Sequence, residues 1–519
     1  MKIKLSTSFL FALLFPVYTE GKVKDLLPRP QQIEMFAENE SFLLHLSVAL
    51  EDPTDCGLLK LFLQQHQCTL DDGAEARIQV ELCTEIPGSY DYLLPGFESE
   101  VYQIKIEKNL VSIKAQSEVG VIRAVQTLQQ MAEGYDSATP ALESLTITDW
   151  PAFKLRGLMH DVGRSFVSIE ELKKEIDLLS RFKINVFHWH LTEKLAWRFE
   201  VKAYPQLTAS ENMVRYPGCY YTQEECRELQ DYAAERGVTV IPEIDMPGHM
   251  LAALASYPEL GCTGGPYEVA TTFGVFRNVL CGGNEKTLQF AKDVINEIMD
   301  IFPSPYIHIG GDECPKYHWK TCAKCQKKIR ELGLKASKEH TKENQLQAWF
   351  MGEVEKEIHK RGREMMAWDE ILAGNPAKST IVMAWTTPEA RLKSIESGYR
   401  TIACPISNLY FSNPKYNKLK GLSSIDRVYS FEPVPEEATS EQKKNLFGAQ
   451  ACIWTEWTKD SVKMEWQMMP RIAALAEIQW TEPANKNIQD FLKRLKHQLD
   501  IYELYGYNYK EDIHEALDK

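Results

Sequence analysis

The feature that most constrains the fold is a series of eight short apolar runs separated by amphipathic helical patterns. The runs begin at Leu155, Ile184, Gly237, Tyr306, Glu364, Ser379, Arg400 and Phe447. Patterns such as SIEELKKEIDLLSRFK lie between them. Alternating strands and helices predict a parallel sheet, and eight such units predict an α/β fold of the closed (β/α)8 TIM-barrel type. An open doubly wound sheet is the alternative, but no glycine-rich phosphate-binding turn follows any of the runs.

A smaller domain is expected ahead of the barrel. YQIKIEKNLVSIKAQ alternates as a hairpin around Lys108–Asn109, and VGVIRAVQTLQQMAE has the spacing of an amphipathic helix. Trp150–Pro151 interrupts regular structure. We therefore predict an N-terminal α/β domain over residues 22–150 and a catalytic barrel over residues 151–519.

The first 21 residues read as a secretory signal peptide. Lys2 and Lys4 precede the apolar run FLFALLFPV, which is too short to span a membrane. Export to the periplasm or the extracellular space is therefore expected, or a lysosomal route in a eukaryote. A mobile apolar N-terminus is the alternative. No later segment is long and apolar enough for a membrane span.

The net charge of −14, without a long basic run, argues against nucleic acid or an anionic membrane as a partner. The twelve cysteines agree with an oxidising compartment. Cys262 and Cys281 bracket a loop and could close it, and Cys314, Cys322 and Cys325 lie close together in sequence. A C-x2-C pair with a third cysteine could bind zinc if a fourth ligand were supplied. Outside the cytosol, disulfides or buried free thiols are the favoured interpretation, with their connectivity left open.

Polar and aromatic side chains gather where the predicted strands end, and this is where barrel enzymes place their chemistry. They are His160, Asp161, Arg164, His188, His190, Glu193, Glu243, Asp245, His249, Asp312, Glu313, Trp368, Asp369, Glu370, Trp385, Trp454 and Glu456. Carboxylates and an arginine can bind hydroxyl groups, and tryptophan faces can pack on sugar rings, so this combination predicts a sugar pocket. His188 and His190 could be metal ligands, but strands five to eight add no histidine, so we expect neither a metal nor a cofactor.

With HIGGDE at the end of the fourth run, the chain resembles the family 20 glycoside hydrolases, the β-N-acetylhexosaminidases. The resemblance includes DVGR, NVFHWHLT, PEIDMPGH, AWDEI and ACIWTEW in the same order. It implies an exo-acting hydrolase that releases terminal β-linked N-acetylglucosamine, and possibly N-acetylgalactosamine, from oligosaccharides or glycoconjugates. The family is an exception to the usual pair of opposed carboxylates, because the substrate's own acetamido oxygen is the nucleophile.

The resemblance also implies a role for each matching residue. Asp312 would orient the acetamido group and stabilise the oxazolinium ion, and Glu313 would be the general acid and base, for which a raised pKa is expected. Matches to substrate-binding positions are Arg164, Trp368, Trp385, Tyr410, Trp454 and Glu456. Asp245 and His249 match a pair that supports the acid. Two positions depart from the family pattern: Glu193 stands where Asp is usual, and Ser412 stands where Asp or Asn is usual.

A non-catalytic sugar-binding protein on a decayed hydrolase barrel is the alternative from another functional class. The presence of Asp312, Glu313, Tyr410 and the tryptophans argues against it. Neither the natural glycan nor the oligomeric state follows from the sequence.

Overall fold

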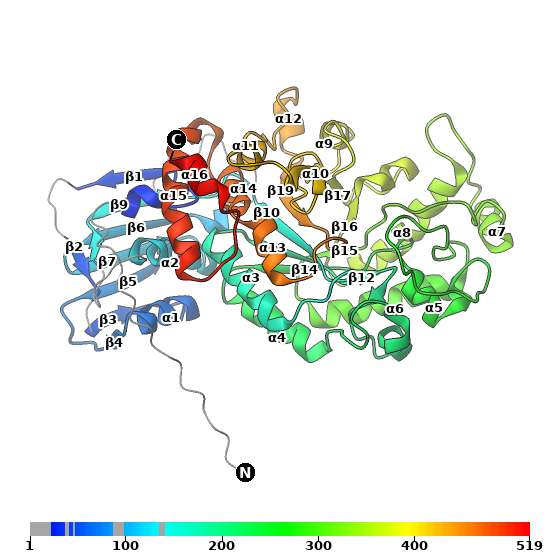
Figure 1. Cartoon of the computed structure of the whole chain (residues 1–519), viewed down its shortest axis with the longest axis horizontal. Coiled ribbons are helices and arrows are strands. Elements are labelled where there is room, and N and C mark those ends of the chain that lie inside the picture. The colour runs from blue at the N-terminus through cyan, green and yellow to red at the C-terminus, as the bar shows by residue number, and fades with distance from the viewer. Residues whose placement is uncertain (1–21, 37–40, 45–46, 87–97, 134–140, 519) are drawn as a thin grey trace, which may run out of the picture.

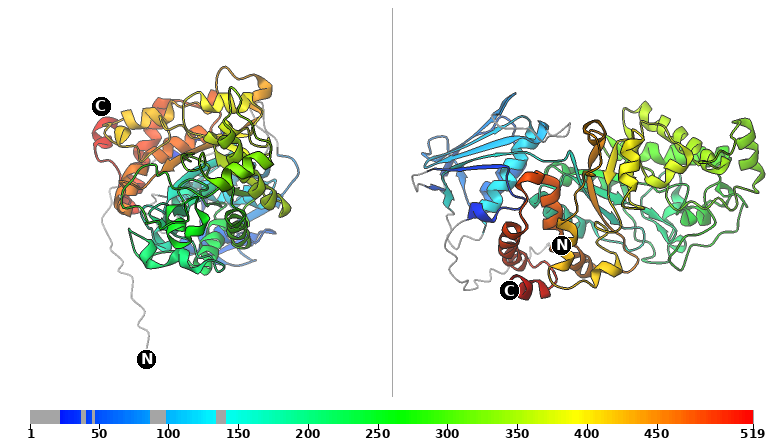
Figure 2. Two further views of the ribbon diagram at one scale, coloured as in Figure 1. Left: turned by 90° about the vertical axis from the view of Figure 1, so that its right-hand side faces the viewer. Right: turned by 90° about the horizontal axis from the view of Figure 1, so that it is seen from above.

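The computed structural model describes residues 22–36, 41–44, 47–86, 98–133 and 141–518. The predicted signal peptide lies outside these residues. Among the described residues, no helix has the length and the apolar character that crossing a membrane requires. Figures 1 and 2 show an N-terminal sheet on one side of the molecule and a barrel beside it.

All eight predicted runs form strands of one closed barrel. In chain order they are β10 (Leu155–Asp161), β11 (Val186–His190), β14 (Thr239–Glu243), β15 (Tyr306–His308), β16 (Glu364–Trp368), β17 (Ile381–Ala384), β18 (Thr401–Ala403) and β19 (Leu446–Ile453). Each strand pairs in parallel with its neighbour along the chain, and β19 closes the ring against β10. The prediction of a (β/α)8 barrel is confirmed.

Helices cover the outside of the barrel. The larger ones are α3 (Ile169–Arg181), α4 (Gln223–Ala234), α6 (Glu285–Ile301), α8 (Lys342–Lys360), α9 (Ala390–Glu396), α11 (Ser423–Tyr429), α13 (Ser461–Met468), α14 (Arg471–Trp480) and α15 (Ile488–Leu504). Ser168 caps the start of α3 and Thr222 caps the start of α4, each in a capping box. In this motif the capping side chain accepts a hydrogen bond from the third helical N–H, and the glutamate at that third position accepts one from the backbone N–H of the capping residue. Apolar faces turned to the strands place the main core between the two layers.

The N-terminal sheet has the order β1-β9-β6-β7-β5-β3-β4. Its strands are β1 (Gln32–Met35), β3 (Ser47–Glu51), β4 (Thr69–Leu70), β5 (Arg77–Leu82), β6 (Tyr102–Glu107), β7 (Leu110–Ala115) and β9 (Leu145–Asp149), and a separate pair joins β2 (Ser41–Leu43) to β8 (Ala141–Glu143). The predicted hairpin is β6–β7, which pair antiparallel with Glu107 opposite Leu110. Helices α1 (Gly57–Gln65) and α2 (Glu118–Ala132) contribute to the core of this domain, and α2 buries the predicted apolar face.

Buried ion pairs join the sheet to the barrel. The Glu100 carboxylate forms ion pairs with Arg123 of α2 at 2.6 Å and with Arg156 of β10 at 2.5 Å. All three side chains are almost fully buried. Lys183, which follows α3, pairs at 2.8 Å with Asp149 at the end of β9. Trp480 from the end of α14 belongs to the apolar core of the N-terminal domain. The two domains are therefore joined by buried ion pairs and a shared apolar core rather than by a solvated boundary.

Two long segments extend from the mouth of the barrel. One follows β14 and contains α5 (Leu251–Ser256) and a bridge between Gly261 and Leu280. The other follows β15 and leads to α7 (Ala323–Glu331). Both appear in green at the end of the molecule opposite the N-terminal sheet (Figure 1).

Candidate active site

A cavity of about 300 Å³ opens at the C-terminal ends of the barrel strands. It is lined by Arg164, His249, Asp312, Glu313, Trp385, Ile406, Tyr410, Ser412, Asn413, Pro414, Trp454, Glu456 and Trp457. Eight of the sequence-predicted site residues therefore meet in one cavity: Arg164, His249, Asp312, Glu313, Trp385, Tyr410, Trp454 and Glu456. The other three, Trp368, Glu193 and Asp245, lie behind its walls.

The two adjacent carboxylates, Asp312 and Glu313, follow an unusual backbone turn after β15. Gly310 and Gly311 have φ of 69° and 99°, and Glu313 itself has φ of 41°. A Cβ at Gly310 would lie 1.7 Å from Oδ1 of Asp245, so only glycine fits there. Oδ1 of Asp245 accepts the Gly311 N–H at 3.2 Å. The turn exposes 36% of the Glu313 side chain but only 9% of Asp312.

His249 lies between the carboxylates of Asp312 and Glu313 and a more deeply buried carboxylate, that of Glu193. Its Nδ1 lies 2.7 Å from Oε1 of Glu193, and its Nε2 lies 3.4 Å from Glu313 and 3.6 Å from Asp312. Glu193 thus contacts His249 from the position where the resemblance leads us to expect an aspartate. Asp245 lies near His249 and Asp312, but its hydrogen bond goes to the backbone of the turn.

The charges around His249 decide how protons are distributed. Burial alone would lower the pKa of His249, but Glu193, Asp245 and Asp312 outweigh it and raise that pKa well above the ordinary value. The hydrogen bond from His249 then lowers the pKa of Glu313. The expectation of a raised Glu313 pKa is therefore wrong for this state of the protein, because a charged imidazole faces a half-exposed carboxylate. Burial instead raises the pKa of Asp312.

Arg164 and Glu456 form the polar side of the cavity. Arg164 pairs with Asp161 at 2.9 Å, with Glu193, and with Glu456 at 3.5 Å, and its guanidinium lies 5.0 Å from the Trp454 ring. Asp161 also accepts the Thr455 N–H at 3.0 Å, which ties the loop after β19 to β10. A fixed guanidinium beside a partly exposed carboxylate is suited to binding vicinal hydroxyl groups.

Three aromatic rings form the apolar part of the lining. Trp385 and Tyr410 stack with their centroids 5.9 Å apart and their planes at 13°, and Trp454 lies 6.1 Å from Tyr410. The Ser412 hydroxyl accepts the backbone N–H of Trp454 at 2.9 Å and so positions the backbone that carries this ring. Trp368 is not among the residues that line the cavity: it is buried behind Trp454, with the two rings 5.9 Å apart.

Beneath the cavity, three histidines surround one buried carboxylate. Glu243 pairs with His188 at 3.0 Å, His190 at 2.6 Å and His308 at 2.9 Å, and it accepts from Trp368 Nε1 at 2.8 Å. The ligand atoms of His188, Glu243 and His308 are close enough together to hold an ion. Glu243, however, already contacts both histidines directly. His188 and His190 therefore belong to a buried cluster of contacts around Glu243 beneath the cavity.

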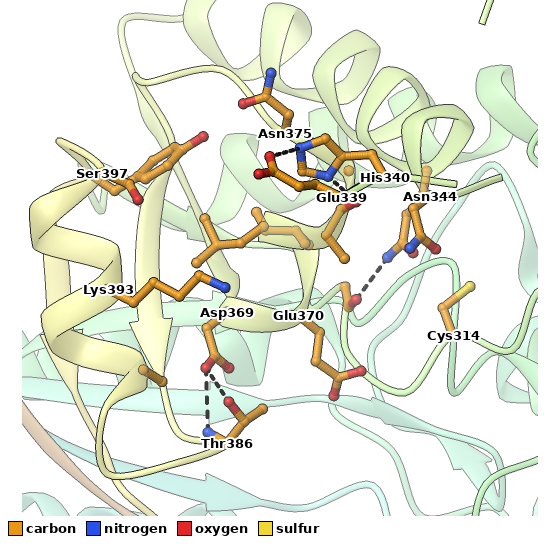
Figure 3. Close-up of a pocket in the computed structure, with 18 of the residues that line it drawn as sticks. Cys314, Glu339, His340, Asn344, Asp369, Glu370, Asn375, Thr386, Lys393 and Ser397 are labelled. Carbon is orange, nitrogen blue, oxygen red and sulfur yellow. Dashed lines mark hydrogen bonds and ion pairs between the residues drawn. The ribbon is translucent and has the colours of Figure 1, made fainter. Parts of the chain in front are cut away.

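A larger cavity, of about 850 Å³, lies behind the turn that carries Asp312 and Glu313. Figure 3 shows its wall around the 3-10 segment η6 (Asp369–Gly374), with Asp369 directed at Thr386, whose hydroxyl donates to Asp369 at 2.5 Å. Glu370 accepts the Glu313 N–H at 3.1 Å, and burial followed by the charge of Asp312 raises the Glu370 pKa to about 7. The lining of this cavity contains neither the arginine nor the group of tryptophans found in the first cavity.

Sequence reasoning missed Trp457 and Asn413. Trp457, the last letter of ACIWTEW, is 66% exposed and lines the cavity. Phe273 from the long segment after β14 packs on it edge-to-face at 5.3 Å. A tryptophan three residues beyond Trp454 in a strand-end loop was the available signal.

Family models cover nearly all of the described chain. Residues 24–150 match the model "Glycosyl hydrolase family 20, domain 2", and residues 153–483 match "Glycosyl hydrolase family 20, catalytic domain". The two matches adjoin near the predicted boundary at Trp150–Pro151.

Individual proteins and structures agree with these matches. The chain is 38% identical over 460 residues to a beta-hexosaminidase of Porphyromonas gingivalis, which covers 84% of this chain and 58% of that protein. It is 32% identical to a beta-hexosaminidase of Vibrio furnissii, over 88% of this chain and 77% of that protein. The crystal structure of a GH20 exo-beta-N-acetylglucosaminidase of Vibrio harveyi with N-acetylglucosamine superposes with a TM-score of 0.80 at 29% identity, covering 96% of this chain and 80% of that one.

Proposed function

The chain belongs to glycosyl hydrolase family 20, and from this membership and the geometry of the cavity we propose that it is an exo-β-N-acetylhexosaminidase. Its substrates would be oligosaccharides or glycoconjugates that end in a β-linked N-acetylglucosamine or N-acetylgalactosamine. The observation that carries the proposal is the cavity in which Asp312 and Glu313 face three aromatic rings and the Arg164–Glu456 pair.

The cavity's size and lining support exo-action. Its volume of about 300 Å³ is at the lower end of the usual range for ligand pockets, about 300–1,000 Å³. Arg164 and Glu456 would bind the hydroxyl groups of the terminal sugar and so leave no path for the chain to continue beyond them. Trp385, Tyr410 and Trp454 would enclose the acetamido group.

The arrangement of the carboxylates favours catalysis assisted by the substrate. In an ordinary retaining glycosidase, two carboxyl groups about 5 Å apart flank the sugar, one as acid and one as nucleophile. Here Asp312 and Glu313 leave the same turn, and the third carboxylate of the lining, Glu456, is paired with Arg164. The acetamido oxygen would therefore attack the anomeric carbon, while Asp312 orients the group and stabilises the positive charge of the oxazolinium ion. Such an intramolecular nucleophile can contribute about 7–11 kcal/mol to lowering the barrier.

Glu313 would protonate the leaving oxygen and later deprotonate the attacking water. Its exposed position on the cavity rim suits a group that must reach both a leaving sugar and water. His249, held by Glu193, would adjust the proton affinity of Glu313 during the cycle, since a positive charge beside the carboxylate disfavours the acid form. Glu193 and His249 are therefore positioning residues for the acid.

The alternative of a non-catalytic sugar-binding protein requires the same cavity but no turnover. Release of 4-nitrophenol from 4-nitrophenyl N-acetyl-β-glucosaminide, abolished or strongly reduced in Glu313→Gln, separates the two. Binding of N-acetylglucosamine without release from any terminal N-acetylhexosaminide would refute the enzymatic proposal. A panel of glycans ending in β-linked N-acetylglucosamine or N-acetylgalactosamine would then define the preferred sugar.

Export is a further part of the proposal and rests on residues 1–21 alone. We infer that the mature protein begins near Gly21 and acts in the periplasm, outside the cell or in a lysosome. N-terminal sequencing of the protein from its native host tests this, and an intact N-terminus on active protein would overturn it.

A further inference from the structure

Four cysteines from two separate segments converge at one point beside the barrel mouth. Cys262 and Cys281 flank the long loop after β14, and Cys322 and Cys325 begin α7. Their four sulfur atoms all lie within 4.8 Å of one another. Cys281 and Cys325 are buried, and Cys262 and Cys322 are partly buried. The sequence grouped Cys314 with Cys322 and Cys325, left a fourth ligand open and favoured disulfides or buried free thiols. The structure leaves Cys314 outside the cluster, and the loop after β14 supplies two cysteines in its place.

The sulfur–sulfur distances have the size expected for ligands of one metal ion. Cys281 lies 3.5 Å from Cys325 and 3.7 Å from Cys322, and Cys262 lies 3.8 Å from Cys325. Four thiolates around zinc at about 2.3 Å in a tetrahedron have sulfur atoms about 3.8 Å apart. Disulfides would instead draw two pairs together to about 2.0 Å. Cys281 has two neighbours at similar distance, so the geometry singles out no pair.

The surrounding chain holds the two segments at this separation. A Cβ at Gly283 would lie 2.4 Å from the Lys324 carbonyl oxygen, and one at Gly282 would lie 2.8 Å from the Trp319 ring. Trp319 donates from Nε1 to the Leu280 carbonyl at 2.9 Å. The close approach therefore depends on two glycines and one tryptophan, and it brings the cysteines together without a covalent link.

The cluster also has a backbone donor. The Gly283 N–H hydrogen-bonds to the sulfur of Cys281. A metal-bound thiolate that is shielded from water commonly accepts hydrogen bonds from backbone N–H groups. The cysteines otherwise pack with Val279, Ile329 and Leu346, so an ion there would be shielded from solvent.

We propose that Cys262, Cys281, Cys322 and Cys325 bind one zinc ion, or another thiophilic divalent ion in its place, as a structural site. Binding releases the thiol protons as the four thiolates form. Four protein ligands leave no open position, so the ion takes no part in hydrolysis. This site is separate from the strand-end histidines for which no metal was expected.

The position of the site gives it a consequence for the mouth of the barrel. The loop between Cys262 and Cys281 carries Gly274, Val275 and Phe276, which line a small cleft together with Glu313 and His249. Phe273 on the same loop packs on Trp457. An ion at the base of this loop would fix it as a wall beside the carboxylate of Glu313.

Metal content and thiol state of the purified wild-type protein test the proposal directly. Protein purified without a chelating tag should contain about one zinc per chain by elemental mass spectrometry. After denaturation with a chelator but no reductant, an alkylating reagent should modify all four cysteines. Replacement by Co²⁺ should give the intense visible bands of tetrahedral thiolate coordination. Less than about 0.2 ion per chain after incubation with zinc, or disulfide-linked peptides among the four cysteines, would overturn the proposal.

Variants locate the ion. Cys322→Ser and Cys325→Ser should each lower the zinc content at least tenfold under dialysis against a competing chelator, and they should increase cleavage within residues 263–280 by a protease. Cys219→Ser, a change at a partly exposed cysteine outside the cluster, should retain the wild-type zinc content. Equal zinc in all three variants would place the ion elsewhere. If the cluster variants do not fold, the measurements on the wild type still decide the question.

Discussion

Replacing Gly310 by alanine should damage both the fold and the reaction, because this glycine is where the catalytic turn touches Asp245. At Gly310 the backbone has φ of 69°, and an added Cβ would lie 1.7 Å from Asp245 Oδ1. Contacts under 3.0 Å essentially never occur for a real Cβ. The turn and Asp245 must therefore separate by about 1.3 Å, the size of displacement that can reduce catalysis about 10²-fold.

Gly333→Ala is the matched control. Gly333 has φ of 65°, nearly the same as Gly310, but an added Cβ there meets nothing within 4 Å. Its cost should be the left-handed strain alone, about 1–2 kcal/mol. Gly310→Ala adds about 1–3 kcal/mol for overpacking and about 1–3 kcal/mol for the lost bond from the Gly311 N–H to Asp245. The expected destabilisation is thus about 3–8 kcal/mol.

Urea unfolding and kcat/KM for a 4-nitrophenyl N-acetylhexosaminide measure the two effects. We expect Gly333→Ala to keep kcat/KM near the wild-type value and Gly310→Ala to lose about 10²-fold or more. The reasoning is refuted if the two variants have kcat/KM values within threefold of each other.

Three further perturbations test the roles assigned to the carboxylates. Glu313→Gln should slow the hydrolysis of natural disaccharides by about 10²–10⁴-fold. The first step with nitrophenyl substrates should be slowed less, since nitrophenolate leaves with little help from an acid. Equal losses of rate for the two substrate types in single-turnover assays would contradict the role of Glu313 as the acid. Asp312→Asn should slow the hydrolysis of both substrate types and weaken the binding of a thiazoline analogue of the intermediate, which calorimetry measures. Equal binding of the analogue to the variant and the wild type, or a sugar trapped covalently on the protein, would exclude the substrate-assisted mechanism. The Glu370 pKa of about 7 lies above the ordinary value, so the stability it provides is complete below about pH 4.5 and is lost as the pH rises through 7. Glu370→Gln should therefore lessen the fall in unfolding free energy between these pH values, and an unchanged slope would count against the raised pKa.

Periodicity made the barrel predictable, because each strand is a short apolar run and each helix has an amphipathic spacing. The strand ends followed from it: once Asp312, Glu313, Arg164 and Glu456 lie at carboxyl ends of parallel strands, the fold brings them to one mouth. The ordered motifs then indicated the family.

Properties that depend on depth and on contacts between distant segments were not predictable. Trp368 ends its strand as expected but lies one layer below the cavity, and sequence position does not give that depth. The pKa of Glu313 was misjudged because the side chain facing it, His249, comes from another strand end and carries a charge that Glu193 maintains. The cysteine cluster was likewise hidden. Cys322 and Cys325 meet Cys262 and Cys281 rather than Cys314, because two loops, 41 residues apart at their nearest cysteines, come together.

The ion pairs between the sheet and the barrel make the N-terminal domain a part of the enzyme that cannot be removed. Deleting it would strip Arg156 and Lys183 of Glu100 and Asp149 and leave two cations facing a severed surface. Breaking one buried pair costs about 3–5 kcal/mol, and losing two would use up a large share of the 5–15 kcal/mol that keeps a protein folded. Trp480, which is buried in the intact protein, would become exposed and add an aggregation-prone apolar patch. A truncated barrel should therefore aggregate during expression, and chimaeras within the family should exchange the two parts together or transplant these charges with them.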